Sequence, residues 1–252
     1  MTIDTILFDL DGTLVQHSHV LLPEKLTEWG YPRSPEDVES AFTEQIHWFY
    51  AFSAAIKGTA EDNPATWDAV WPRLYGRVTA QLGIDDPNIV AHMVDYFADD
   101  PTPPLYDDAL PLLETLAQGQ WRLGMITQRG RRGALRFLGD HDLADRFEVI
   151  IAGDDGHGRK PDPEPFRRAL SVLESDARHA IFIGDRVDDD CGGAFGAGLR
   201  AFLIDRHGQH ADGEHDLTHG GDITYIRLES LLDLLHHLDA HPEDEAQWPL
   251  PR

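Results

Sequence analysis

Two aspartates, Asp9 and Asp11, follow an apolar run near the start of the chain and are separated by one residue. The run, residues 3–8, predicts a short strand, yet aspartate is depleted in strands. Gly12 then favours a sharp turn at the end of this strand. Two carboxylates this close repel each other unless something positive lies between them. The spacing leaves open whether a metal ion, a phosphate site or only water meets them.

Further polar side chains stand at the ends of later apolar runs. Thr127 and Asp185 each follow such a run directly, and Lys160 lies in the loop after another. Ligands of parallel α/β sheets bind beyond the carboxyl ends of the strands, so these side chains are expected on the same rim as Asp9 and Asp11. Each residue alone is compatible with an ordinary turn, strand end or solvated surface. Their convergence on one rim favours a functional site.

The elements that must position these residues alternate along most of the chain. Apolar runs and helix-start signals predict strands at residues 3–8, 122–127, 148–152, 180–184 and 201–204, and helices at 34–55, 67–82, 89–97, 108–118 and 133–138. Such alternation predicts an α/β fold with a doubly wound parallel sheet. No strand pattern occurs between about residues 20 and 98. We therefore expect a discontinuous core, residues 1–15 and 101–252, and an inserted α-helical cap, residues 16–100.

In this order, the segments Asp9-Leu10-Asp11-Gly12-Thr13, Thr127, Lys160-Pro161 and 184–190 (GDRVDDD) resemble the motifs of haloacid dehalogenase-like hydrolases. The resemblance spans residues 7 to about 204 and includes the helical insertion. It implies a hydrolase of the phosphatase type, with a Rossmann-like core and a helical cap.

The resemblance also implies a role for each matching residue. Asp9 would attack phosphorus and form an aspartyl-phosphate. Asp11 would protonate the leaving alkoxide and then activate water. Thr127 would donate a hydrogen bond to a phosphoryl oxygen, and Lys160 would neutralise the carboxylates and the phosphate.

A Mg²⁺ cofactor is implied in the same way, since this ion favours hard oxygen ligands and substrate phosphate. The expected ligands are the carboxylates of Asp9 and Asp185 and the backbone carbonyl of Asp11, with Asp190 acting through water. Two positions depart from the family pattern. Gln128 stands where a small polar residue is common, and Asp189 where asparagine is common. Their roles stay open.

Other polar segments receive plainer interpretations. The arginines that follow Thr127 are expected to be solvated residues at a helix start, with contact to an anionic substrate as the alternative: Arg129, Arg131 and Arg132. The irregularly spaced histidines late in the chain are expected in an exposed loop: His207, His210, His215 and His219. The glycine-rich run 192–198 lies inside an expected helix, so a dinucleotide-binding loop is rejected.

The composition limits the classes of molecule that the protein is expected to bind. The 252-residue chain has a formal net charge of −24 with only three lysines, and it has no run as long and apolar as a membrane span. Such acidity excludes nucleic acid and anionic membranes as favoured partners. The balance resembles that of proteins from halophiles, in which concentrated salt screens the repulsion. A single cysteine, Cys191, is compatible with a reducing cytoplasm.

The function expected is that of a Mg²⁺-dependent phosphatase for a small phosphorylated metabolite, similar to phosphoglycolate phosphatases. A 2-haloacid dehalogenase is a family alternative, but dehalogenases generally lack the second aspartate, here Asp11. A phosphomutase would use the same aspartyl-phosphate. A noncatalytic binding module would not need the acids, the lysine and the threonine together. The oligomeric state is not predicted.

Overall fold

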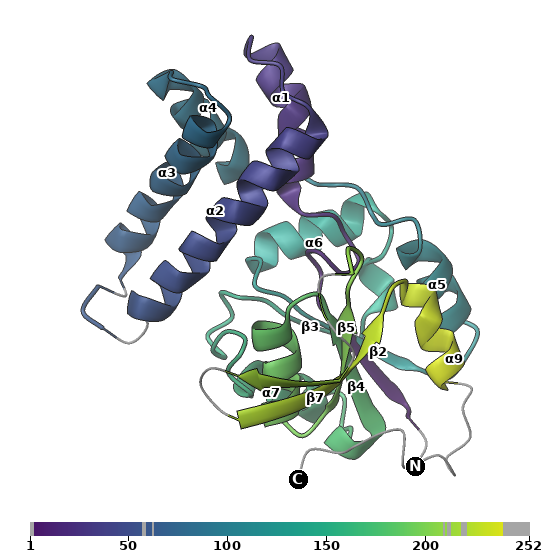
Figure 1. The fold of residues 1–252 in the computed structure, drawn as a ribbon. Coiled ribbons are helices and arrows are strands. Elements are labelled where there is room, and N and C mark those ends of the chain that lie inside the picture. The colour runs from purple at the N-terminus through teal and green to yellow at the C-terminus, as the bar shows by residue number, and fades with distance from the viewer. Residues whose placement is uncertain are drawn as a thin grey trace. The chain divides into compact units, whose positions relative to one another are not determined.

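The computed structural model describes residues 3–56, 59–61, 63–208, 210, 213–217 and 221–238 (Figure 1). The chain divides into two compact units. One comprises residues Met1–Gln16 and Pro104–Arg252, and the other comprises His17–Pro103. The larger unit holds the sheet and every residue of the candidate site, so it is described first.

A seven-stranded sheet forms the centre of the larger unit, in the order β3-β2-β1-β4-β5-β7-β6. The strands are β1 (Thr5–Phe8), β2 (Arg122–Ile126), β3 (Val149–Ile151), β4 (Ala180–Gly184), β5 (Arg200–Ile204), β6 (Gly213–Leu217) and β7 (Gly221–Leu228). All neighbouring pairs are parallel except β6 with β7 at one edge. The expected parallel α/β fold is therefore confirmed.

Helices cover both faces of this sheet, which makes it doubly wound. Successive residues of β1 point to opposite faces: Ile6 and Phe8 join one apolar core and Leu7 the other. Helices α5 and α6 contribute Leu112 and Phe137 to the first core. The helices and short turns of this unit are α5 (Ala109–Leu116), α6 (Arg131–Asp140), η2 (Ala144–Arg146), α7 (Glu164–Val172), η3 (Ala177–His179), η4 (Val187–Gly192), α8 (Gly193–Gly196), η5 (Leu231–Asp233) and α9 (Leu234–Leu238).

Burial on both faces explains why the central strands are almost entirely apolar, with Thr5 and Arg200 as polar exceptions at the starts of β1 and β5. All four residues of β1 are buried, and so are all five of β4 and of β5. Strands covered on both faces read as continuous hydrophobic runs, not as alternating ones. That pattern is what made these strands predictable from the sequence.

The smaller unit is helical, as the sequence predicted. It contains η1 (Ser18–Leu21), α1 (Leu22–Glu28), α2 (Pro35–Ile56), α3 (Pro64–Gln81) and α4 (Pro87–Ala98). Asn63 and Asp86 begin α3 and α4 by accepting backbone hydrogen bonds, each followed by proline at the first helical position. The unit has its own core, in which Leu26, Leu74 and Met93 are buried.

The sheet edge differs from the expectation. Residues 213–217 form the strand β6, with His215 inside it, where a loop was expected, and residues 221–228 form β7, where no element was predicted. His207 and His210 lie in turns or bends beyond β5, and His219 lies outside the described residues. β6 carries the sequence GEHDL, which has no apolar run to mark a strand.

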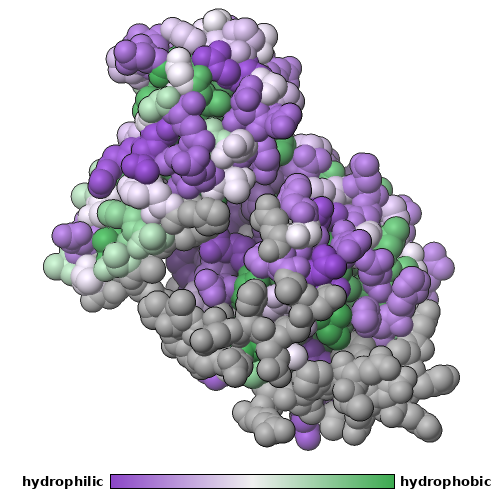
Figure 2. Space-filling view, viewed as in Figure 1, coloured by the Kyte–Doolittle hydropathy of each residue, from purple (hydrophilic) through white to green (hydrophobic). Residues whose placement is uncertain are grey.

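Hydrophilic side chains cover most of the described surface on the face shown in Figure 2. This agrees with the strongly acidic composition, a formal net charge of −24. Within the described residues, no helix combines the length and the apolar character that crossing a membrane requires.

Candidate active site

The ends of β1 and β2 fix the first two candidate residues. Asp9 continues the sheet ladder beyond β1, because its N–H donates to the carbonyl of Ile183 at 2.8 Å. In the same way the N–H of Thr127 donates to the carbonyl of Ile151 at 2.9 Å. Both side chains are buried. Gly12, with a φ of 83°, then turns the chain sharply after Asp11.

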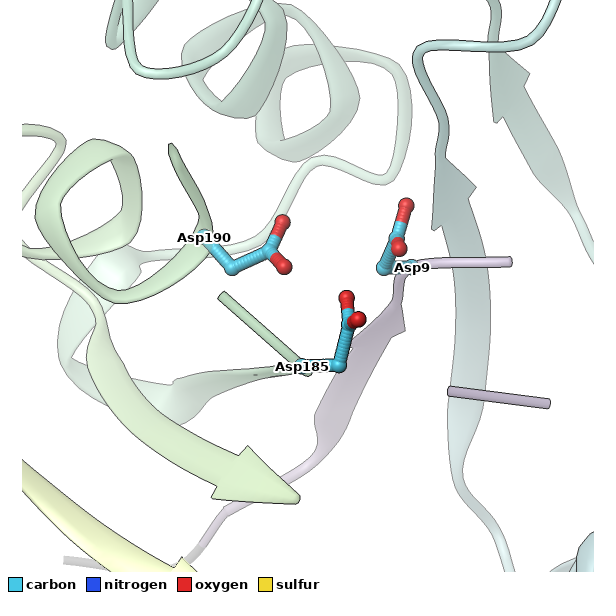
Figure 3. Close-up of side chains that lie close together, drawn as sticks. All are labelled: Asp9, Asp185 and Asp190. Atoms are coloured by element: carbon cyan, nitrogen blue, oxygen red, sulfur yellow. The ribbon is translucent and has the colours of Figure 1, made fainter. Parts of the chain in front are cut away.

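Three carboxylates meet at this rim. One oxygen each from Asp9, Asp185 and Asp190 lie within 4.8 Å of one another, and the three side chains point toward one another in Figure 3. Asp9 and Asp190 are almost entirely buried. Carboxylate oxygens in this number and spacing fit the preference of Mg²⁺ for hard oxygen donors with water completing the shell.

Lys160 lies inside the carboxylate cluster. Its Nζ donates to Asp9 Oδ1 at 2.6 Å and also forms an ion pair with Asp190 Oδ1. Burial raises the pKa of Asp9 well above its usual range, although the charge of Lys160 opposes this shift. For Lys160, burial acts to lower the pKa, but the charges of Asp190 and Asp9 prevail and raise it. The lysine is thus held as a cation between two buried acids.

A π-helical turn, η4, brings Asp190 back against the end of β4. Asp190 Oδ2 accepts from the N–H of Arg186 at 3.0 Å, and Oδ1 is bound by Lys160. A β-carbon on Gly184 would stand 2.3 Å from Asp190 Cγ, so this position has no room for a side chain. Both carboxylate oxygens of Asp190 therefore already have protein donors.

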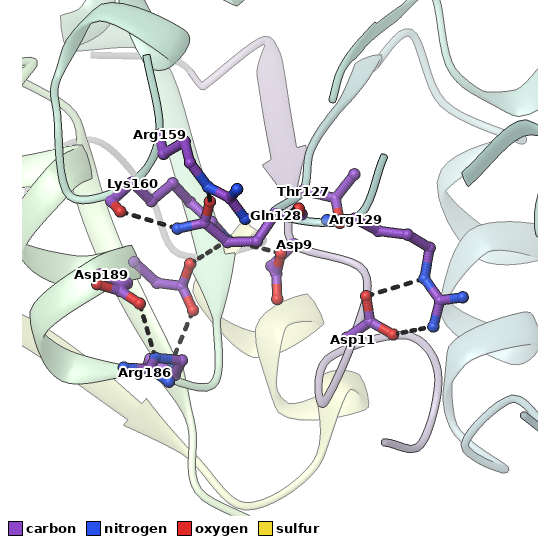
Figure 4. A network of polar contacts seen from close by, with 10 residues as sticks. Asp9, Asp11, Thr127, Gln128, Arg129, Arg159, Lys160, Arg186 and Asp189 are labelled. Atoms are coloured by element: carbon purple, nitrogen blue, oxygen red, sulfur yellow. Dashed lines mark hydrogen bonds and ion pairs between the residues drawn. The ribbon is translucent and has the colours of Figure 1, made fainter. Parts of the chain in front are cut away.

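Asp11 lies apart from that cluster and pairs with Arg129. Arg129 Nη2 donates to Asp11 Oδ1 at 2.5 Å and Nε to Oδ2 at 3.2 Å, as Figure 4 shows. The Arg129 side chain is only 8% exposed and that of Asp11 27%. Arg129 is therefore not a solvated helix-start residue, which corrects the expectation from sequence. Its low exposure has no signal in the sequence.

The other two arginines after Thr127 have different environments. Arg131 pairs with Asp155, with Nη2 and Oδ2 2.5 Å apart, and its side chain is 44% exposed. Arg132 is exposed. For this last residue the interpretation as a solvated side chain at the start of α6 agrees with the structure.

Gln128 joins the loop after β2 to the loop that carries Lys160. Its Nε2 donates to the backbone carbonyl of Lys160 at 2.8 Å, and its Oε1 accepts from Arg159 Nε at 3.0 Å (Figure 4). Arg159 Nη2 also donates to the Gln128 carbonyl at 3.1 Å. Gln128 thus holds the lysine loop in place, a role that the sequence left open.

Thr127 and Asp189 complete the rim. The hydroxyl oxygen of Thr127 accepts from the N–H of Arg129 at 3.0 Å, which leaves the hydroxyl proton available for donation. Asp189 Oδ2 lies 2.9 Å from Arg186 Nε. Burial raises the pKa of Asp189. Its contact with Arg186 places this acid beside the backbone that supports Asp190.

A further anchor holds the loop after Asp11, and sequence reasoning missed it. Arg206, just beyond β5, donates from Nη2 to the carbonyl of Thr13 at 2.9 Å. Asp108 accepts from both Nη atoms of Arg206, at 2.9 and 3.0 Å. It also accepts from Ser230 Oγ and the N–H of Leu231, each at 2.9 Å. These residues are far apart in the chain, so no local pattern marks them.

The model of one protein family matches residues 3–198, and its description is a haloacid dehalogenase-like hydrolase. The chain belongs to this family. The resemblance drawn from the motifs is thereby confirmed, and the protein is a hydrolase. The match begins before β1 and ends after α8, so it includes the inserted helical unit as well as every candidate site residue.

Relatives of similar length agree with this family. This hydrolase is 30% identical over 243 residues to a protein named phosphoglycolate phosphatase from Cereibacter sphaeroides, covering 92% of this chain and 98% of the relative. It is 27% identical over 241 residues to a protein named pyrophosphatase PpaX from Halalkalibacterium halodurans, covering 93% and 96% of the two chains.

A solved structure also shares its fold. The magnesium-bound YfnB of Bacillus subtilis has a TM-score of 0.73 and 21% identity to this hydrolase, covering 95% of this chain and all of the other. At this identity the likeness concerns the fold alone.

Proposed function

We propose that this hydrolase is a Mg²⁺-dependent phosphatase that acts on a small phosphorylated metabolite through an aspartyl-phosphate. The observation that carries the proposal is the buried cluster in which Lys160 binds Asp9 and Asp190 beside Asp185. A phosphate ester repels an anionic nucleophile, so such a reaction needs compensating positive charge at the nucleophile. The names of the relatives, phosphoglycolate phosphatase and pyrophosphatase, support the substrate class.

The reaction would proceed in two steps, each carried out by residues of this chain. An Asp9 carboxylate oxygen forms the new bond to phosphorus while the bond to the leaving oxygen breaks, and Asp11 gives that oxygen a proton. Water then attacks the phosphorus of the aspartyl-phosphate and passes a proton to Asp11. Asp9 and inorganic phosphate are released. Thr127 donates to a phosphoryl oxygen, and Lys160 neutralises charge beside the nucleophile.

Asp9, Asp185 and the backbone carbonyl of Asp11 would hold the Mg²⁺, with Asp190 ordering its water. The ion supplies positive charge that offsets the repulsion between phosphate and carboxylates. Asp190 suits an indirect role, because Lys160 and the N–H of Arg186 already bind its two oxygens.

Phosphate release from p-nitrophenyl phosphate tests this proposal, with and without Mg²⁺ and at low and molar KCl, since the acidity points to a salt-rich cytoplasm. We expect activity that requires Mg²⁺, disappears with chelator and is lost in Asp9→Asn. Full activity of that variant would overturn the role of Asp9. Metal-independent halide release from 2-chloropropionate, without phosphatase activity, would instead establish a dehalogenase. A folded protein silent in both assays would favour a binding module.

A further inference from the structure

The pairing of Arg129 with Asp11 is specific in its geometry. Two guanidinium nitrogens meet the two carboxylate oxygens, at 2.5 and 3.2 Å. Arginine uses this same two-pronged contact for carboxylates and phosphates in general. The same two nitrogens have the geometry to bind a carboxylate or a phosphate of another molecule in place of Asp11.

The backbone of Arg129 is held independently of its guanidinium. Its N–H donates to Thr127 Oγ1 at 3.0 Å, and its carbonyl accepts from the N–H of Gly153 at 3.0 Å. The side chain can therefore change its partner by rotation, while the loop that carries Thr127 stays in place.

The pair is also more accessible than the two ion pairs that Lys160 forms at this rim. The Asp11 side chain is 27% exposed, whereas Asp9 is 7% and Asp190 is 0% exposed. A carboxylate in contact with water holds its cationic partner more weakly than a buried one does. An entering anion would therefore compete for Arg129 more readily than for Lys160.

We propose that Arg129 selects substrates that carry a second anionic group, a carboxylate or another phosphate, besides the phosphoryl group that is cleaved. This inference rests on the proposed phosphatase function. The second anion takes the guanidinium from Asp11, and the Asp11 side chain becomes able to turn toward the leaving oxygen. A substrate without that anion leaves Arg129 on Asp11. Arg129 thereby determines specificity.

Two esters of one skeleton separate this effect from phosphoryl binding. Phosphoglycolate and ethyl phosphate differ only in a carboxylate in place of a methyl group, and pyrophosphate supplies the phosphate form of the second anion. We expect wild-type kcat/KM to be higher for phosphoglycolate than for ethyl phosphate. Arg129→Gln should lower that ratio about 10- to 100-fold, mainly through KM, as expected for the loss of a charged hydrogen-bonded pair. Whether pyrophosphate or phosphoglycolate loses more shows which second anion the site prefers.

Arg132→Gln is the matched control. It removes the same charge three residues away on an exposed side chain, and we expect it to keep the wild-type ratio. Arg129→Lys keeps the charge but loses the two-pronged contact, and its ratio should lie between those of wild type and Arg129→Gln. If Arg129→Gln keeps the wild-type ratio of the two kcat/KM values, whether both values fall equally or neither falls, the inference is overturned.

A binding experiment keeps this inference separate from the catalytic proposal. In the Asp9→Asn background, calorimetric titration with phosphoglycolate and with ethyl phosphate should show tighter binding of phosphoglycolate. Adding Arg129→Gln should remove the difference. If wild type hydrolyses neither ester yet this difference is seen, the proposed function fails and the role of Arg129 stands. Equal affinity for the two ligands overturns the role of Arg129 whatever the activity.

Discussion

The carboxylate of Asp190 lies directly against Gly184. A β-carbon at this glycine would stand 2.3 Å from Asp190 Cγ and 2.5 Å from Cβ, distances that no packed pair of carbons adopts. Gly184 precedes Asp185, so one absent side chain lets two acids of the cluster approach. The glycine at the end of β4 is thus part of how the site is built.

Gly184→Ala tests this relationship. We expect the added methyl group to displace Asp190 and to lower kcat at least 10-fold, with a weaker dependence on Mg²⁺, together with a loss of stability of about 1–3 kcal/mol from overpacking. Gly139→Ala in α6 is the control, because its β-carbon would meet no atom within 4 Å. That change should keep activity and raise stability slightly, since alanine favours a helix. Wild-type kinetics in Gly184→Ala would refute the account.

Lys160→Met should be strongly destabilising as well as inactive. Removing the lysine leaves Asp9 and Asp190 buried without their cation, and breaking a buried pair costs about 3–5 kcal/mol. Urea unfolding at neutral pH measures the loss. The double variant Lys160→Met/Asp190→Asn should recover part of it, because one buried charge is gone.

Lys25→Met provides the comparison for that experiment. Lys25 pairs with Glu28 on α1 at 2.9 Å, but neither side chain is buried, with exposures of 30% and 51%. Its replacement should leave the unfolding midpoint nearly unchanged. Similar losses at positions 25 and 160 would show that burial does not govern the contribution of Lys160.

Gln128→Ala should reduce kcat several-fold with little change in KM. The variant loses the hydrogen bond to the Lys160 carbonyl and the acceptor for Arg159, and each such bond contributes about 1 kcal/mol. Gln118→Ala, at an exposed turn position, is the control and should be silent. A changed KM with unchanged kcat would instead make Gln128 a substrate contact.

The contribution of Asp108 to the free energy of unfolding should depend on pH. Burial opposes ionisation here, but hydrogen bonds from Arg206, Leu231 and Ser230 outweigh it and lower the pKa of Asp108. A carboxyl whose pKa is lower in the folded state stabilises the protein above its unfolded pKa of about 3.9, and this contribution is lost as pH falls through the folded value.

Asp108→Asn measures that contribution. At pH 7 we expect the variant to unfold with about 2 kcal/mol less free energy than wild type, since charged hydrogen bonds are weakened. The gap should narrow as the pH is lowered from 5 to 3. Denaturant titrations at several pH values follow it. A gap that stays constant down to pH 3 would rule out ionised Asp108 as its source.

The sequence predicted the buried central strands and the acidic residues that directly follow two of them. Apart from Thr5 and Arg200 at their first positions, β1, β4 and β5 are apolar because helices cover both faces, and a polar residue after each of the first two strands marks the rim. Asp9 and Asp185 could be located from that pattern alone. Only the family resemblance gave them roles.

The rest depended on contacts between distant segments. β6 has a polar sequence at the sheet edge, where one partner strand and no apolar run define it. The partner of Arg129 lies 118 positions earlier in the chain, and the carbonyl that Gln128 binds lies 32 positions later. Helix and strand periodicities carry no information about such pairs.

The central place of β1 in the sheet also constrains the timing of folding during synthesis. β1 lies between β2 and β4. The N–H of Asp9 donates to the carbonyl of Ile183, which is synthesised much later. Ribosomes add roughly 5–20 residues per second, so about 10–35 s separate the emergence of these two partners. β2, which pairs with one edge of β1, is synthesised within that interval, but the edge of β1 that pairs with β4 has no partner until the interval ends. We therefore expect the nascent hydrolase to present an unpaired, aggregation-prone strand edge, on which chaperones could act, until β4 has been synthesised.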